Sequence, residues 1–275
     1  MYRAVPVHPA LAGVVLGIAA YAETSPVRVR RRQSPVGSCT LILGIGGALR
    51  LDGPDGTSAP TAFLAGLHDS TVTTSFVGHQ AGVQVDLTPL GLLRLLPLAP
   101  ADLAGRVPDL DALGVGELAR LPARIAEDVS WDARLARVQD TLQRLLSCST
   151  AAPDPEVAWA WRRLERARGR VPVSVLADEV GWSRRHLLTR FRAQVGLAPT
   201  PVGRILRFRH AADLLLPGAG PGRRPADARI ADVAAAAGYS DHAHLVREFR
   251  ALAGCTPSAY VGGFPDVQDL DDAPP

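Results

Sequence analysis

The last third of the chain contains the same pattern twice, 57 to 58 residues apart. The first copy extends from Leu176 to Pro199 and the second from Val233 to Pro257. In each copy an apolar stretch leads to a glycine, an aromatic residue and a serine, and then to Leu and Phe four positions apart. An internal repeat of this length is one supersecondary unit used twice. The pattern predicts two units of short helix, glycine turn and second helix, which is the helix-turn-helix arrangement.

The apolar residues of each unit are spaced for helices that bury one face. The first stripe is Val173, Leu176, Ala177 and Val180, and the second is Ile230, Val233, Ala234 and Ala237. Gly181 and Gly238 follow, where a residue without a Cβ can adopt positive φ and end a helix. Ser183 and Ser240 come next and are expected to cap the second helices. Those helices are expected to bury Leu187 with Phe191 and Leu245 with Phe249, each pair at i, i+4.

The remaining residues of each second helix face outward and are candidates for contacts with DNA. Arg can pair with the guanine edge, and Thr or Val can contact the thymine methyl group. The expected base-reading residues are Arg184, Arg185, Leu188 and Thr189 in the first unit and His242, Ala243, Val246 and Arg247 in the second. The expected phosphate contacts are Ser183, Arg192, Ser240 and Arg250. The alternative is an ordinary solvated helix face, on which Leu188 and Val246 are unusual.

Positive charge is concentrated in the repeated region. Residues 151–260 contain 17 Arg and 10 acidic residues, whereas residues 1–150 contain 13 basic and 13 acidic residues. Residues 261–275 contain 4 acidic residues and no basic one. A basic excess confined to the repeat is the distribution expected of a surface that binds phosphate.

The segment between the two units is expected to be one helix, Pro201 to Leu216, with proline at its start. Its buried stripe is Ile205, Phe208, Ala212 and Leu215. Sixteen residues rise about 24 Å, which is of the order of the ~34 Å between successive major grooves. The spacing predicts that one protomer contacts two adjacent major-groove segments on one face of a duplex.

The second unit carries a family signature. Its residues are Ile230-Ala231-Asp232-Val233-Ala234, Gly238-Tyr239-Ser240-Asp241, His244 to Arg250, and Gly254 to Tyr260. This pattern resembles that of AraC/XylS-type transcription regulators, and the resemblance covers roughly residues 155 to 262. It implies two helix-turn-helix units joined by a long linker helix. The base-reading positions that it implies are Arg185, Leu188 and Thr189 in the first unit and His242, Ala243, Val246 and Arg247 in the second. It also implies a cupin-like sensing domain before them.

Two features depart from that family pattern. Leu188 is apolar where a polar reader is common, so the first helix is expected to rely on Arg185 and on DNA shape. The Gly- and Pro-rich segment 217–228 is longer than usual. It is expected to be a disordered solvated loop, with phosphate contacts by Arg223 and Arg224 as the alternative.

The N-terminal part of the chain has a different pattern. Up to about residue 98, short apolar runs alternate with Gly, Pro and Asp, which favours an antiparallel β-barrel or sandwich. The runs are 39–43, 48–51, 62–64, 71–76 and 82–87. From Pro89 the pattern becomes helical, and the last of these helices, Leu135 to Leu146, is expected to pack on the barrel, with pairing of protomers as the alternative.

The predicted fold is therefore α+β: an N-terminal cupin-like barrel or sandwich with helices, then an all-α domain. We expect an N-terminal sensing or oligomerisation domain at 1–150, with the barrel at about 1–98 and helices at 99–150. The Pro-containing segment Ala151 to Pro155 is the expected boundary. A DNA-binding domain is expected at 155–262 and a disordered acidic tail at 263–275.

Signals for enzymes and metals are weak. Gly44 to Gly47 is expected to be a hairpin turn rather than a dinucleotide loop, since Leu49 and Leu51 alternate like a strand. His242 and His244 are two positions apart on a helix, so they cannot chelate one metal. His8, His68 and His79 are scattered. His68 and Asp69 are expected in a loop, with a place at the barrel mouth as the alternative.

Cysteine usage and the early residues favour a cytoplasmic protein. Cys39, Cys148 and Cys255 lack paired spacing, so free thiols are expected, with a redox-sensing Cys39 as the alternative. Residues 10–22 mimic a signal peptide, but Arg3 is the only early positive charge, so a buried first strand or helix is favoured. Arg28 and Arg30 to Arg32 suit a solvated strand edge better than a nucleic-acid arm.

These observations predict a sequence-specific DNA-binding transcription regulator, modulated by a ligand or by dimerisation through its N-terminal domain. The candidate partners are double-stranded DNA, RNA polymerase, a small-molecule effector and a second protomer. A membrane is not among them, because no apolar run reaches the ~18 residues that a span needs. No catalytic residue, metal or cofactor is expected. The rival interpretation is a barrel enzyme with a helical partner-binding module.

Overall fold

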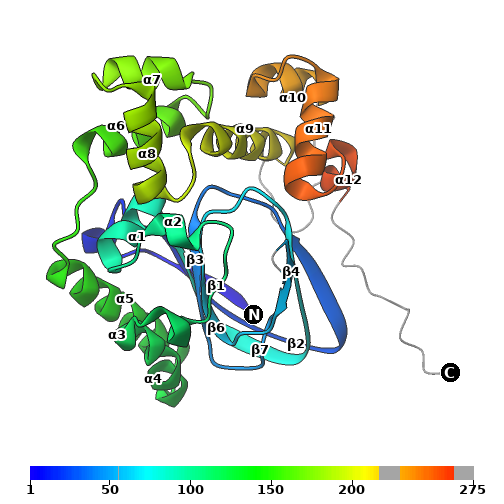
Figure 1. The fold of residues 1–275 in the computed structure, drawn as a ribbon. Coiled ribbons are helices and arrows are strands. Elements are labelled where there is room, and N and C mark those ends of the chain that lie inside the picture. The colour runs from blue at the N-terminus through cyan, green and yellow to red at the C-terminus, as the bar shows by residue number, and fades with distance from the viewer. Residues whose placement is uncertain (55, 217–229, 263–275) are drawn as a thin grey trace.

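The computed structural model describes residues 1–54, 56–216 and 230–262. An antiparallel sheet forms the N-terminal part, and a layer of helices lies across one end of it (Figure 1). This is the α+β order of elements that the sequence predicts. The segment 217–228 and the acidic tail 263–275, both expected to be disordered, lie outside the described residues.

Within the described residues the sheet has seven strands in the order β1-β2-β7-β3-β6, and β4 pairs with both β7 and β5. Their bounds are β1 (Tyr2–Val5), β2 (Val15–Gln33), β3 (Cys39–Gly44), β4 (Arg50–Gly53), β5 (Gly56–Ser58), β6 (Ala62–Ala65) and β7 (Val72–Leu87). The two long strands, β2 and β7, pair from Val15 with Leu87 to Gln33 with Val72. β1, Val5 to Tyr2, covers only part of β2, so the Arg-rich end of β2 is a strand edge, as expected.

Two expectations for the sheet are wrong. Residues 72–76 of the first run and the run 82–87 belong to the single strand β7, because β2 pairs with both. The break between the two runs corresponds to a register shift between Ser25 and Val29 of β2 and to a positive φ of 85° at Gly78. The segment 44–47 is not a hairpin turn. It continues along β7 toward β4, with the Ile45 N–H donating to the Ala81 carbonyl at 2.8 Å and the Gly47 N–H to that of His79 at 3.0 Å.

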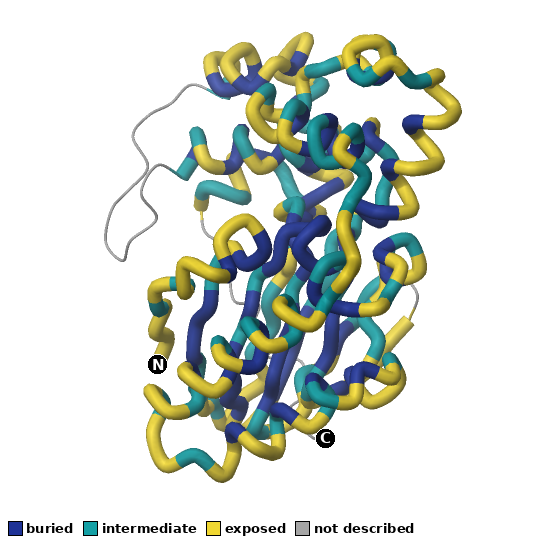
Figure 2. Tube along the Cα trace, turned by 90° about the vertical axis from the view of Figure 1, so that its left-hand side faces the viewer, coloured by how far each residue is buried: buried dark blue, intermediate teal, exposed yellow. Residues whose placement is uncertain are grey.

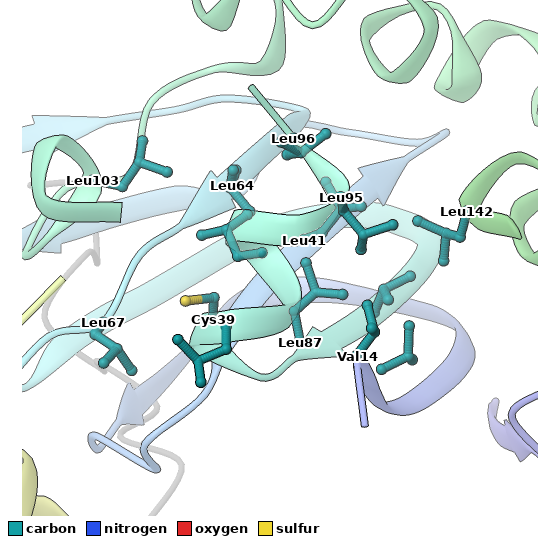
Figure 3. Close-up of a cluster of buried hydrophobic side chains, with 14 of the residues drawn as sticks. Val14, Cys39, Leu41, Leu64, Leu67, Leu87, Leu95, Leu96, Leu103 and Leu142 are labelled. Carbon is teal, nitrogen blue, oxygen red and sulfur yellow. The ribbon is translucent and has the colours of Figure 1, made fainter. Parts of the chain in front are cut away.

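Helices cover one side of this sheet. Their bounds are η1 (Pro9–Leu11), α1 (Pro89–Leu95), α2 (Pro100–Leu103), η2 (Leu110–Leu113), α3 (Gly116–Ala119), α4 (Leu121–Glu127) and α5 (Trp131–Cys148). Figure 3 shows Cys39 and Leu87 of the sheet, Leu95 of α1 and Leu142 of α5 in one apolar cluster. The face of α5 that carries Leu142 thus packs within the chain, and pairing of protomers through this helix stays a prediction.

The helical layer consists of α6 (Pro155–Arg166), α7 (Val173–Glu179), α8 (Arg184–Val195), α9 (Pro199–Leu215), α10 (Ile230–Ala237), α11 (His242–Ala253) and α12 (Pro257–Val261). The repeat is present as α7–α8 and α10–α11, and α9 joins them. In Figure 2 the buried parts of these helices face inward and their outer turns are exposed. The linker helix begins two residues before the predicted Pro201, because Pro199 takes its first position.

The two helix-turn-helix units have different cores. Leu187 and Phe191 of the first unit belong to the same apolar cluster as the sheet, whereas Phe249 of the second unit lies in a separate one. Helix α9 contributes Val202 to the first cluster and Phe208 to the second. The apolar core therefore continues past residues 151–155, and the domain boundaries expected there stay a prediction.

Candidate nucleic-acid interface

In the first unit the turn forms as the sequence predicts. Gly181 follows α7 with a φ of 70°, a conformation that costs little without a Cβ. The Ser183 Oγ accepts the backbone N–H of His186 at 3.2 Å, which caps α8. Leu187 and Phe191 are fully buried. These contacts fix the start and the rotation of α8, so the other side chains of its first two turns are exposed.

In the second unit the cap is Asp241 and not the predicted Ser240. Gly238 has a φ of 79°, and the Asp241 carboxylate accepts the backbone N–H of His244 at 2.6 Å. That hydrogen bond holds the pKa of Asp241 below its usual range. Ser240 is one additional residue in the turn, and its hydroxyl donates to Asp241 at 3.2 Å. The inserted residue accounts for the change of the repeat spacing from 57 to 58 within the turn.

The predicted base-reading residues lie together near the start of each second helix. Arg184, Arg185, Leu188 and Thr189 on α8 and His242, Ala243 and Arg247 on α11 are exposed, and Val246 is half-buried. The predicted phosphate contacts Ser183, Arg192, Ser240 and Arg250 are exposed as well. Within the described part of the chain, none of these arginines forms an ion pair. The surface is thus available to a ligand, and the role of each residue stays a prediction.

The C-terminal ends of α8 and α11 both rest on the N-terminal domain. Gly196, which ends α8, packs on the carbonyl of Pro100, where an added Cβ would approach to 3.0 Å. At the end of α11, Arg32 donates to the Gly254 carbonyl at 3.3 Å, and Thr71 donates to the Leu252 carbonyl at 3.0 Å. The N-terminal halves of both helices therefore point away from the sheet, as Figure 1 shows.

Two ion pairs hold these helices in place. Arg190 on α8 binds Asp154 with two hydrogen bonds, 2.7 and 2.8 Å long, and lowers the pKa of that carboxyl. Arg204 on α9 binds Glu248 on α11 with two hydrogen bonds of 3.1 Å. Both pairs use the planar fork of the guanidinium, which orients its partner as well as attracting it.

Comparison with known proteins identifies this part of the chain. Residues 176–262 match a family model described as a helix-turn-helix domain. They are an AraC-type helix-turn-helix domain. The resemblance that the sequence shows to this family is confirmed, and with an AraC-type domain the chain is a DNA-binding transcription regulator. Among curated protein sequences, none matches the chain.

Solved structures show the same fold around the AraC-type domain. The chain is similar to ToxT from Vibrio cholerae, both in an apo variant and bound to (E)-4-(8-methylnaphthalen-1-yl)but-3-enoic acid. In each case the identity is 9%, the likeness covers 89% of this chain and 97% of that chain, and the TM-score is 0.50. The C-terminal domain of AraT, a response regulator from Geobacillus stearothermophilus, is similar over 40% of this chain and 85% of its own, with 19% identity and a TM-score of 0.35.

A cavity of about 1040 Å³ lies between the sheet and the AraC-type domain. Its wall includes Tyr21, Ser34, His68 and Arg106 from the N-terminal part and Phe208, Arg209 and Tyr260 from α9 and α12. His68 is in the loop after β6, as expected, and also lines this cavity. The buried Ser34 Oγ and His68 Nε2 have no hydrogen-bond partner among the described residues. Burial lowers the pKa of His68 and raises that of Tyr21 to about 12.

Other candidate sites have little support. Burial raises the pKa of the Cys39 thiol to about 12, so the reactive thiolate is scarce at neutral pH. In the described ranges, no three His, Cys, Asp or Glu side chains are grouped so that they could hold a metal ion. Among the described helices, none combines the length and the apolar character needed to cross a bilayer.

Proposed function

We propose that this regulator is sequence-specific and that one protomer reads two adjacent major-groove segments, the first with α8 and the second with α11. The observation that carries the proposal is the common direction of the two helices. Each is anchored at its C-terminal end on the N-terminal domain and presents its N-terminal half, with Arg185 or Arg247, on the side away from the sheet. A helix inserted into the major groove by its N-terminal residues is the usual geometry of this motif.

The linker helix supports the same proposal. Helix α9 has 17 residues, a rise of about 25 Å. It is held near both ends by packing, through Val202 on the first core and Leu215 on the second. A stiff spacer of this length suits two contacts on one face of a duplex, since adjacent major grooves on that face are one helical turn apart.

Selection of bound fragments from random duplexes tests this function. The expected result is one binding site with two specified segments, about 10 base pairs apart, each protected in the major groove. Binding should weaken steeply as salt is raised, because phosphate contacts release counterions. A protein that ignores DNA at low salt, or protects one groove segment per protomer, would contradict the proposal.

The N-terminal domain is proposed to respond to a small amphipathic acid in the cavity. The cavity combines apolar walls with Arg106 and Arg209, and Ser34 and His68 offer it unpaired polar atoms. Phe208 and Tyr260 line it and also pack edge-on against Phe249 of α11, with ring centroids 4.8 and 5.4 Å away. A ligand there would touch two side chains that support the second recognition helix.

The effector proposal is tested with small amphipathic carboxylic acids and their neutral amides. The acids should raise the melting temperature with increasing concentration and change the affinity for the selected duplex. Ala65→Phe narrows the cavity from strand β6, which lines it, and should abolish the ligand effect while DNA binding persists. Equal effects of acid and amide, or an unchanged ligand effect in Ala65→Phe, would contradict it. The remaining proposed partners are a second protomer and RNA polymerase. Affinity for the selected duplex, measured at increasing protein concentration and with added RNA polymerase, tests them.

A further inference from the structure

Three nitrogen-bearing side chains lie between the two helix-turn-helix units. Arg168 and Arg170 belong to the loop from α6 to α7, and His210 lies on α9. The Arg168 guanidinium contacts the His210 Nε2 at 2.5 Å. The side-chain stem of Arg170 reaches the turn of the second unit, where it lies against Gly238. We refer to Arg168, Arg170 and His210 as the saddle.

The backbone of the saddle is unusual at Arg168. Among the described residues it is the one non-glycine with positive φ, 51°, a conformation that costs roughly 1 to 2 kcal/mol for a residue with a Cβ. The next residue, Gly169, also has positive φ, 71°, and an added Cβ there would overlap the carbonyl of Gly203 on α9. The loop is thus pressed onto α9. An arginine retained where glycine or asparagine would be relaxed points to a use for its side chain.

Positive charge dominates the saddle. Partial burial lowers the pKa of His210, and the positive charges of Arg168 and Arg170 lower it further, whereas Asp213 raises it. Arg170 uses its Nε–H on the Ala167 carbonyl at 3.3 Å. A guanidinium has five N–H donors, so both arginines, which are exposed, keep donors for a ligand.

The saddle faces the side on which DNA is proposed to bind. Phe208 and Ala212 of α9 line the cavity over the sheet, whereas Gly203 and His210 contact the α6–α7 loop. Positions 203 and 210 lie on one side of a helix and 208 and 212 on the opposite side. The saddle is therefore on the outer face of α9, between the exposed halves of α8 and α11.

A duplex engaged by both recognition helices turns the minor groove between its two major-groove segments toward α9. We propose that the saddle binds phosphates of the DNA backbone along that minor groove, an interaction that rests on the proposed two-groove function. Phosphate is the ligand that clustered guanidinium groups recognise best. The contact carries no base information; it fixes how far the duplex approaches α9.

The test is the salt dependence of binding to a duplex selected by the wild-type protein. Arg168→Asn keeps a residue that tolerates positive φ but removes the charge, and Arg170→Gln removes the second charge. The double variant should reduce the slope of log affinity against log salt by about 0.9 for each phosphate that it no longer binds, with an unchanged selected sequence. Hydroxyl-radical protection of the segment between the two major grooves should disappear.

Arg124→Gln on α4 is the matched control, because it removes one exposed positive charge at the opposite end of the molecule. It should leave the slope and the protection unchanged. A double variant with wild-type slope and wild-type protection overturns the saddle while the two-groove function stands. Failure of the wild-type protein to select any duplex overturns the function itself. Circular dichroism and the melting temperature establish that the double variant is folded. Arg168→Lys, which keeps the positive charge that Arg168→Asn removes, should retain most of the wild-type salt slope.

Discussion

Arg32 in strand β2 donates a hydrogen bond to the backbone carbonyl of Gly254, 222 positions later in the chain, at 3.3 Å. Gly254 ends α11 in a left-handed conformation, so the guanidinium lies at the negative end of the helix dipole, where a cation is favourable. The Thr71 hydroxyl binds the Leu252 carbonyl beside it. Two side chains from the N-terminal domain thus hold the end of the second recognition helix.

Arg32→Ala should loosen this end of α11. The expected loss of stability is about 0.5 to 1 kcal/mol, because the arginine is exposed and water screens its contact. Amide hydrogen exchange should become faster in the last turn of α11. Arg28→Ala, on an exposed arginine of the same strand, is the control and should leave that exchange unchanged. Equal exchange in both variants would show that packing alone holds the helix.

Arg247→Ala should weaken specific DNA binding by roughly 1 to 3 kcal/mol and relax the preference at one position of the second segment. Arg250→Ala removes a charge of the same kind from the same helix. It should weaken binding to all sequences alike, since its expected partner is phosphate. Repeating the duplex selection with each variant gives the comparison. An unchanged sequence preference in Arg247→Ala would remove this residue from the readers.

Phe191→Ala and Phe249→Ala should behave differently although the residues are equivalent in the repeat. Both side chains are fully buried, so each truncation should cost about 3 to 5 kcal/mol. Phe191 belongs to the core shared with the sheet, and its loss should lower the stability of the whole chain. Phe249 belongs to the separate core, so its loss should unfold α10 and α11 first. Calorimetry should then show two transitions for Phe249→Ala and one for Phe191→Ala.

Acidification should destabilise the protein through His68. Burial lowers its pKa in the folded state, whereas an unfolded histidine titrates near pH 6.5. The unfolded chain therefore binds more protons between the folded pKa and about 6.5, and stability falls as the pH is lowered through that window. His68→Gln should reduce the slope of the free energy of unfolding against pH by up to about 1.4 kcal/mol per pH unit. Denaturant unfolding at pH 7.5, 6.5 and 5.5 measures this slope, and His242→Gln, on an exposed histidine, is the control. A slope as steep in His68→Gln as in the wild type would exclude this residue.

The helical domain was predictable because its determinants are local. Gly181 ends a helix, Ser183 caps the next, and Leu187 and Phe191 set its buried face, all within 11 positions. One local error, Ser240 in place of Asp241, arose because two residues in succession can cap a helix and the deciding contact is the 2.6 Å bond to the His244 N–H.

The contacts between the two parts of the chain were not predictable in the same way. Arg32 looked like a solvated strand residue, and its partner is a backbone carbonyl, which carries no sequence signal. The glycines of segment 44–47 indicated a turn, because the contact that requires a glycine there comes from a distant part of the sequence. An added Cβ on Gly46 would lie 2.8 Å from the backbone nitrogen of Ala81. The register of a sheet is decided by such long-range pairs.

Helix α9 belongs to two cores, one continuous with the sheet and one of its own making. Helix α8 consequently belongs to the core that includes the sheet, whereas the second unit is joined to it through α9 and through the contacts of Arg32, Thr71 and Arg170. A conformational change in the N-terminal domain that tilts α9 would therefore alter the distance between α8 and α11 without unfolding either helix. The protein would then distinguish operators by the spacing between their two half-sites more than by the base sequence of each half-site.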